Sequence, residues 1–127
     1  FIGEIHDTHH PVAKSKYYDE QKEEAQKHAA DFVEHRLPKF LRYFERALDG
    51  RDHFLGSLSY VDLSMFQIMD GLAYAFPNAL AKNEAPQLRA LHDRVAERPR
   101  IAAYLASPRR LPFNEHGLFR HYPELDR

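Results

Sequence analysis

The sequence contains no cysteine in its 127 residues. This absence excludes disulfide bonds, thiolate-bound zinc and cysteine nucleophiles within the chain, and it fits a reducing compartment. Lysine and arginine (18) nearly balance aspartate and glutamate (19), so no excess charge favours nucleic acid or an anionic membrane. No run of about 18 apolar residues and no basic-then-apolar leader occurs. We therefore expect a cytoplasmic protein with no membrane or nucleic-acid partner.

Glycine is also scarce, with five residues, although eight prolines punctuate the chain. No stretch alternates apolar and polar residues with a period of two, which argues against strands. With 43% hydrophobic and 29% charged residues, the composition is that of a globular domain. The length corresponds to about one domain, so we expect a single all-α unit.

The chain opens with FIGEIHD, which has apolar residues at helical spacing and no capping residue before them. We expect a helix from Phe1 to about His10, ended or kinked by Pro11. Because this start resembles the middle of a helix, we interpret residues 1–127 as a fragment of a longer protein.

A second helix is predicted from Asp19 to Leu48, where apolar residues recur in steps of three and four opposite a charged face. Pro38 lies inside this stripe and should bend the helix rather than end it, because the period resumes at Phe40.

The segment GSLSYVDLSMFQIMDGLAYAF, residues 56–76, predicts the central helix. Ser59 suits the N-cap and Asp62 lies three residues later, which is the spacing of a capping box, so we assign both a role in folding. Leu58 and Leu63 are placed to form a hydrophobic staple. Beyond the cap the helix is apolar on nearly every side, which predicts a helical bundle built around it.

Two shorter helices are expected to begin at Pro86 and Pro99, since proline suits the first turn. Ile101, Tyr104 and Leu105 should face inward from the second of these. The tail, residues 107–127, has no helical period but is too aromatic for a disordered segment, and we expect it to lie against the bundle.

These features together resemble the C-terminal domain of cytosolic glutathione S-transferases. The resemblance is carried by RLPKFLRYFERAL, by the capping box of the central helix and by PQLRALHDRVAERPRIAAYLASP, in that order. The tail and HDTHHP look most like bacterial members. The resemblance covers essentially the whole chain, residues 1–127.

In that family an all-helical domain follows a thioredoxin-like domain that holds most of the glutathione site and activates its thiol. The resemblance thus implies a transferase that adds the glutathione thiolate to apolar electrophiles, with glutathione as co-substrate, no cofactor and a homodimeric assembly. This domain would supply the electrophile pocket and part of the dimer interface, and would be inactive alone. The residues themselves show no glycine-rich phosphate loop and no nucleophile with a plausible base.

Asp7 is the candidate glutathione-binding residue. In many classes of the family a carboxylate on this helix meets the glutamyl ammonium of glutathione bound to the other subunit. Asp7 precedes the cap residue Ser59 by a separation similar to the family's. The alternative is a solvated aspartate on a helix face.

Aromatic residues are the candidates for the electrophile pocket. The family places aromatic side chains near Tyr17 and Tyr18, where a phenol can also donate a hydrogen bond to the substrate. Phe113, Phe119 and Tyr122 in the tail are placed to close the same pocket. Ordinary packing is the alternative for each, and it is the favoured one for the tail residues.

The cluster HDTHH suggests a metal site, but helical geometry argues against one. On a helix His6 and His10 share a face, His9 lies beside them and Asp7 points away. Two histidines without an acidic third ligand are a weak zinc signal, so we expect a polar helix face and no metal.

Two other functions stay open at this level. The domain could be a non-catalytic relative that acts as a protein–protein interaction module, or a helical bundle of unrelated function, because fold does not fix function. The sequence of this chain identifies neither the electrophilic substrate nor the residue that activates the thiol.

Overall fold

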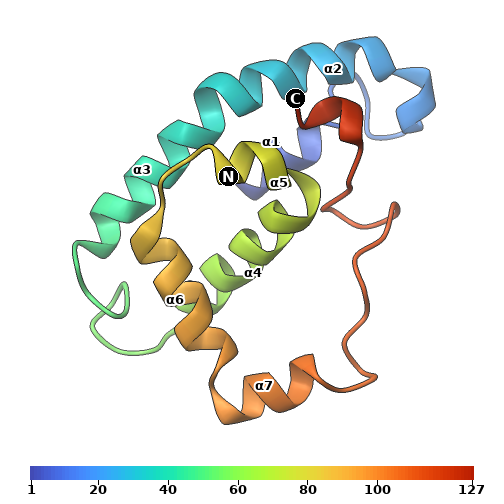
Figure 1. Ribbon diagram of the computed structural model, residues 1–127. Helices are drawn as coiled ribbons and strands as arrows, with labels where there is room; N and C mark the ends of the chain where they lie inside the picture. Colours follow the sequence, from blue (N-terminus) through green and yellow to red (C-terminus); the bar gives the residue numbers. More distant parts are fainter.

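The computed structural model describes residues 1–127 and consists of helices and connecting segments, without strands, as the sequence predicts. Figure 1 shows α2 and α3 as one long rod, with α4, α5 and α6 packed beside it. None of the helices has both the length and the apolar character needed to cross a membrane. The elements are α1 (Ile2–Asp7), η1 (Tyr18–Glu20), α2 (Lys22–Asp31), η2 (Phe32–Arg36), α3 (Leu37–Leu48), α4 (Tyr60–Ala75), α5 (Pro77–Ala81), α6 (Pro86–Ala96), α7 (Pro99–Leu105) and η3 (Pro123–Leu125).

The long rod contains a π-helical turn, η2, immediately before Pro38. The amide of Leu37 donates to the carbonyl of Phe32, five residues earlier, instead of following the α-helical pattern. A proline ring clashes with the carbonyl four residues before it in an α-helix, and the wider turn accommodates this clash. The rod continues past Pro38, as predicted, and a π turn precedes the proline. The rod begins at Lys22, three residues later than the predicted start.

The capping box closes the start of α4. The Ser59 amide donates to the Asp62 carboxylate at 2.7 Å, and the amide of Val61 donates to the Ser59 hydroxyl at 3.3 Å. Asp62 is fully buried and also accepts from the Phe54 amide at 3.1 Å. Asp62 thus fixes both the helix start and the loop that precedes it.

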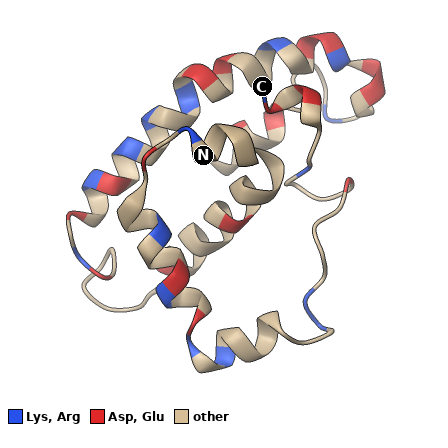
Figure 2. Ribbon diagram, viewed as in Figure 1, with Lys and Arg blue, Asp and Glu red and all other residues tan.

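Helix α4 supplies the centre of the bundle and packs against α5 and α6. Its buried residues are Asp62, Met65, Phe66, Ile68, Met69, Gly71, Leu72 and Ala75. Figure 2 shows that charged residues follow the outer side of α2 and α3, whereas α4 and α5 carry few. The enclosure of α4 is less complete than the sequence suggests, because Leu63, Gln67 and Ala73 are exposed on one side.

Helices α6 and α7 begin at Pro86 and Pro99, as predicted. Helix α7 lies at the margin of the bundle and has no buried residue. Its Tyr104 is 42% exposed, so the prediction that this side chain faces inward is wrong. The tail returns across the bundle and buries Phe119 and Leu125.

Candidate functional site

The irregular segment between α1 and η1 is held in place by one glutamine. Gln21 is 1% exposed, and its carbonyl oxygen accepts from the amides of Val12 and Ala13 at 3.0 and 3.3 Å. Its side-chain amide donates to the carbonyls of Ala13 and Lys16, both at 3.1 Å. Gln21 therefore acts as an internal template for the loop that presents Tyr17.

The end of the tail is fixed by Asp126, which is 2% exposed. Its carboxylate accepts from the backbone amides of Asn78 and Ala79, each at 2.8 Å, at the start of α5. An acidic side chain satisfies the free amides of a helix N-terminus in this way. The contact joins the last residues of the chain to the centre of the bundle.

Tyr18 links the loop to the tail. Its ring stacks on that of Tyr122 with centroids 3.8 Å apart, and its hydroxyl donates to the Glu124 carboxylate at 2.9 Å. Burial, followed by the hydrogen bond and the charge of Glu124, raises the pKa of Tyr18 far above its ordinary value. The Glu124 pKa is lowered by its own backbone amide and then by the Tyr18 hydroxyl. At neutral pH the proton therefore stays on Tyr18 and is directed to Glu124.

A hollow of about 330 Å³ lies between the loop and the tail. Three of the predicted pocket residues, Tyr17, Tyr18 and Tyr122, are in its wall. The remaining wall is polar, so the hollow is less apolar than the family pattern suggests. These other lining residues are Asp19, Lys22, Glu115, His116, Arg120 and Glu124.

The two predicted phenylalanines lie outside this wall. Phe113 stacks on Tyr74 of α4 with centroids 4.8 Å apart, and its ring meets that of Phe119 edge-on at 5.9 Å. Phe119 is buried against Gly71 of α4. Both residues are therefore placed in packing of the tail against α4, which is the alternative that the sequence favours.

Asp7 is the last residue of α1. Its side chain is 43% exposed, and its carboxylate lies 3.5 Å from His6 Nδ1. The Asp7 carboxylate makes no hydrogen bond or ion pair with a residue of the hollow. The carboxylate is thus available at the surface, and Asp7 is not among the residues that line the hollow.

Helix α1 ends at Asp7 and not at His10, which corrects the predicted helix boundary. Thr8 is buried and its hydroxyl donates to the Ile5 carbonyl at 2.7 Å, completing the last turn. The backbone then leaves the helical path, so the helical geometry that placed only His6 and His10 on a common face does not hold. His6, His9 and His10 instead come together, with potential ligand atoms all within 4.8 Å of one another.

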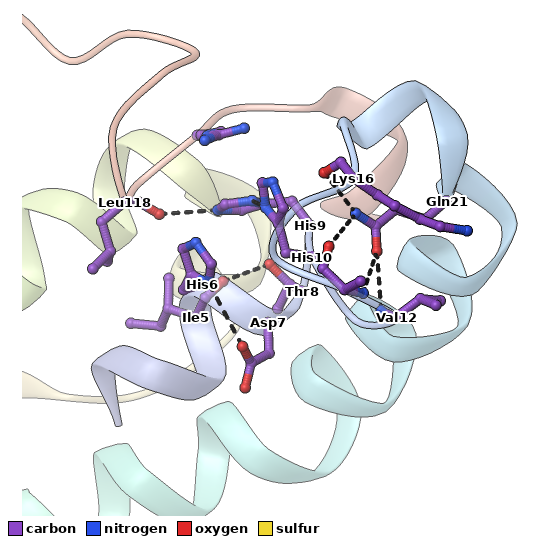
Figure 3. Close-up of polar contacts among 12 residues, drawn as sticks. Ile5, His6, Asp7, Thr8, His9, His10, Val12, Lys16, Gln21 and Leu118 are labelled. Atoms are coloured by element: carbon purple, nitrogen blue, oxygen red, sulfur yellow. Dashed lines mark hydrogen bonds and ion pairs between the residues drawn. The ribbon is translucent and has the colours of Figure 1, made fainter.

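Figure 3 shows the three histidines beside the tail segment at Leu118. His9 is 1% exposed, and one of its ring nitrogens, Nε2, lies 3.0 Å from the Leu118 carbonyl. Burial lowers the pKa of His9 to about 4. Burial and the positive charge of Arg120 lower the pKa of His10 as well. His9 is thus a neutral imidazole at neutral pH.

Sequence reasoning missed Gln21, Glu124 and Asp126. All three are polar residues in otherwise unremarkable surroundings, and each acts on backbone or side chains that only the fold brings near. Part of the Asp126 contact has a sequence signal, because Pro77 is typical of the first turn of a helix and an acidic side chain is a common cap for a helix N-terminus. Nothing in the spacing joins two positions that lie 47 residues apart.

Comparison with known proteins gives one consistent result. Residues 6–108 match the family model described as the glutathione S-transferase C-terminal domain. The chain is 29% identical over 126 residues to a glutathione S-transferase of Dirofilaria immitis, covering 92% of this chain and 56% of that protein. It is 28% identical over 82 residues to the class-mu 26 kDa isozyme 7 of Fasciola hepatica, covering 64% of this chain and 37% of that protein. The chain thus spans about half, or less, of the length of these curated relatives.

Proposed function

Because this chain belongs to the glutathione S-transferase family, we propose that it is the C-terminal helical domain of a transferase that joins glutathione to small electrophiles. The observation that carries the proposal is the hollow walled by Tyr17, Tyr18 and Tyr122, of which Tyr17 and Tyr18 lie within the residues that the family model matches. A thioredoxin-like domain of the full-length protein would bind glutathione and lower the pKa of its thiol. This domain would hold the electrophile.

The chemistry is nucleophilic attack by the glutathione thiolate on an electrophilic carbon. A carbon–sulfur bond forms while the bond to the leaving group breaks, or while an epoxide or conjugated double bond takes up the electron pair and then a proton. Aromatic rings in the wall favour a flat apolar substrate by stacking. The charged rim supports electrophiles that also carry polar groups, such as nitro substituents.

Of the two adjacent tyrosines, Tyr17 is the better candidate for a donor to the substrate. Its side chain is 81% exposed, whereas the Tyr18 hydroxyl already donates to Glu124. A phenol that donates to a developing negative charge contributes general-acid or electrostatic assistance. In this proposal Tyr18 shapes the wall and positions the loop.

We also propose that the full-length protein is a homodimer in which Asp7 reaches the glutathione of the other subunit. The exposed carboxylate at the end of α1 supports this role, because a glutamyl ammonium would give a charge-assisted hydrogen bond. The alternative is an interaction module that has kept the fold but lost glutathione binding.

The test is a calorimetric titration of the full-length protein with glutathione, followed by a conjugation assay with a nitroaryl chloride. We expect binding and chloride release, and we expect Asp7→Asn to raise KM for glutathione with little change in kcat. Asp31→Asn is the matched control, since Asp31 lies on the exposed face of α2. Failure of the wild-type protein to bind millimolar glutathione would favour the interaction module.

A further inference from the structure

We propose that His6, His9 and His10 form a binding site for one divalent transition-metal ion, for which Zn²⁺ is the probe. The potential ligand atoms of the three rings lie within 4.8 Å of one another. The site lies where the segment after α1 meets the tail (Figure 3). The proposal uses no step of the glutathione chemistry, although it shares Asp7 with the proposed glutathione contact.

The bond to Leu118 fixes the state of His9. A backbone carbonyl only accepts hydrogen bonds, so His9 Nε2 carries the proton that it donates at 3.0 Å. The other nitrogen, Nδ1, of a neutral ring then has a free lone pair. Metal-binding histidines typically donate their second nitrogen to a carbonyl or carboxylate in this way, which orients the ring. His9 is therefore already arranged as a ligand.

His10 faces this lone pair. The Nδ1 atoms of His9 and His10 are 2.5 Å apart and part of a buried contact. Two nitrogens on a tetrahedral zinc ion are about 3.3 Å apart, given zinc–nitrogen distances of about 2.0–2.1 Å. The two rings therefore need to separate by less than about 1 Å to admit an ion. His10 is on the irregular segment and outside the helices, so this separation does not require a helix to move.

His6 supplies the third ligand from the end of α1. Its ring is stacked on that of His10, with centroids 4.9 Å apart and planes 12° apart. The Asp7 carboxylate lies 3.5 Å from His6 Nδ1 and is placed to orient this ring as Leu118 orients His9. The His6 side chain is 24% exposed, which gives an ion a route from solvent.

The ligand set defines the class of ion. Three neutral imidazoles suit Zn²⁺, Cu²⁺ or Ni²⁺ and do not suit Mg²⁺ or Ca²⁺, which prefer oxygen ligands. The positive charge of the Arg120 guanidinium is felt at His9 and His10 and would repel a bound cation. This guanidinium donates hydrogen bonds to the carbonyls of Gly117 and His116. Asp7 partly compensates this charge.

A bound ion would fasten the segment after α1 to the tail. His9 contacts the tail through Leu118, and its ring also meets that of Tyr122 edge-on at 6.3 Å. Tyr122 is part of the wall of the hollow. The ion would thus stabilise one wall of the hollow without itself lining it.

The experiment is titration of the chelator-treated, tag-free full-length protein with Zn²⁺ by calorimetry, with Co²⁺ as an optical reporter of nitrogen coordination. We expect one ion per chain, a rise in melting temperature on adding Zn²⁺, and no competition from Mg²⁺. Displacement of Zn²⁺ by an equal concentration of Mg²⁺ would indicate oxygen ligands and overturn the proposal.

Variants identify the ligands. We expect His6→Gln and His10→Asn each to weaken Zn²⁺ binding roughly tenfold or more and to abolish the Co²⁺ spectrum. His35→Gln is the matched control, because His35 is an exposed histidine between two acidic residues, an ordinary place for adventitious binding. His6 is only half-buried, so His6→Gln is expected to keep the fold, which the melting curve of the chelated variant checks. If the wild type binds no Zn²⁺, or if His35→Gln is the variant that weakens binding, the proposal is wrong.

Discussion

The ring of Phe119 lies directly against the backbone of Gly71 in the middle of α4. A Cβ atom added at position 71 would overlap three carbons of that ring, Cγ, Cδ1 and Cε1. Gly71 is therefore required by close approach of the tail and not by its backbone angles, which are those of a helix. This contact seats the tail on the central helix.

Gly71→Ala tests the contact. Alanine is the better helix former by about 1 kcal/mol, so helix propensity alone predicts stabilisation. We expect instead a loss of about 1–3 kcal/mol in the free energy of unfolding, because Phe119 must leave its place. Gly3→Ala in α1 is the control, since nothing lies within 4 Å of its added Cβ. Urea unfolding measures both, and a stabilised Gly71→Ala variant would contradict the packing described.

Asp62 makes stability depend on pH at the acid end. Burial, the largest single influence, raises its pKa, but hydrogen bonds from the amides of Ser59 and Phe54 and from the Ser59 hydroxyl outweigh it and leave the pKa below its ordinary value of 3.8. Because the pKa of Asp62 is lower in the folded state than in the unfolded state, the ionised carboxylate stabilises the fold fully above the unfolded-state pKa. This stabilisation is lost as the pH falls through the folded-state pKa.

For Asp62→Asn we expect the free energy of unfolding near neutral pH to fall by about 1–3 kcal/mol. The variant should also lose part of the acid dependence below about pH 4. Thermal unfolding at a series of pH values measures this. Asp93→Asn, on the exposed side of α6, should keep the wild-type profile. Parallel profiles for wild type and Asp62→Asn would rule out Asp62 as the source.

Gln21 determines the order of the loop that carries Tyr17. Gln21→Met keeps the volume but removes four hydrogen bonds to the loop backbone, and we expect it to cost about 2–3 kcal/mol. Trypsin should then cut faster after the exposed Lys14 and Lys16. Gln26→Met, at an exposed position of α2, should change neither stability nor cleavage. Equal cleavage rates in the two variants would argue against the template role.

The two adjacent tyrosines should differ in function. In the full-length protein we expect Tyr17→Phe to lower kcat for electrophiles whose leaving group accepts a hydrogen bond, with little effect on stability, because the side chain is exposed. Tyr18→Phe should destabilise the fold by about 1–2 kcal/mol by removing the bond to Glu124, with kcat nearly unchanged. Tyr43→Phe, an exposed tyrosine on α3, is the control for both. If Tyr18→Phe instead lowered kcat and Tyr17→Phe instead lowered the stability, the two roles would be exchanged.

The helices were largely predictable from the sequence because their signals are local. The apolar period of the α2–α3 rod, the prolines that start α6 and α7, and the Ser59–Asp62 pair all act within a few residues. The same patterns identified the family. The predicted helix end at His10 failed because Thr8 and the turn that follows it compete with helix continuation, a preference that the apolar period does not report.

The site was predictable only in part. Tyr17, Tyr18 and Tyr122 were found through the family resemblance and line one hollow, whereas Phe113 and Phe119 pack against α4. Their role in binding an electrophile, and that of Asp7 in binding glutathione, stay predictions.

By itself the sequence determined the long helices, how α4 begins and which helix occupies the centre, since periodicity and capping depend on neighbours along the chain. Only the tertiary structure decided what the isolated polar residues do. Tyr18 meets Glu124 across 106 residues, Asp126 caps α5 across 47, and His9 meets the Leu118 carbonyl across 109. Such pairs follow from the path of the tail over the bundle, and a chain's local pattern carries no record of that path.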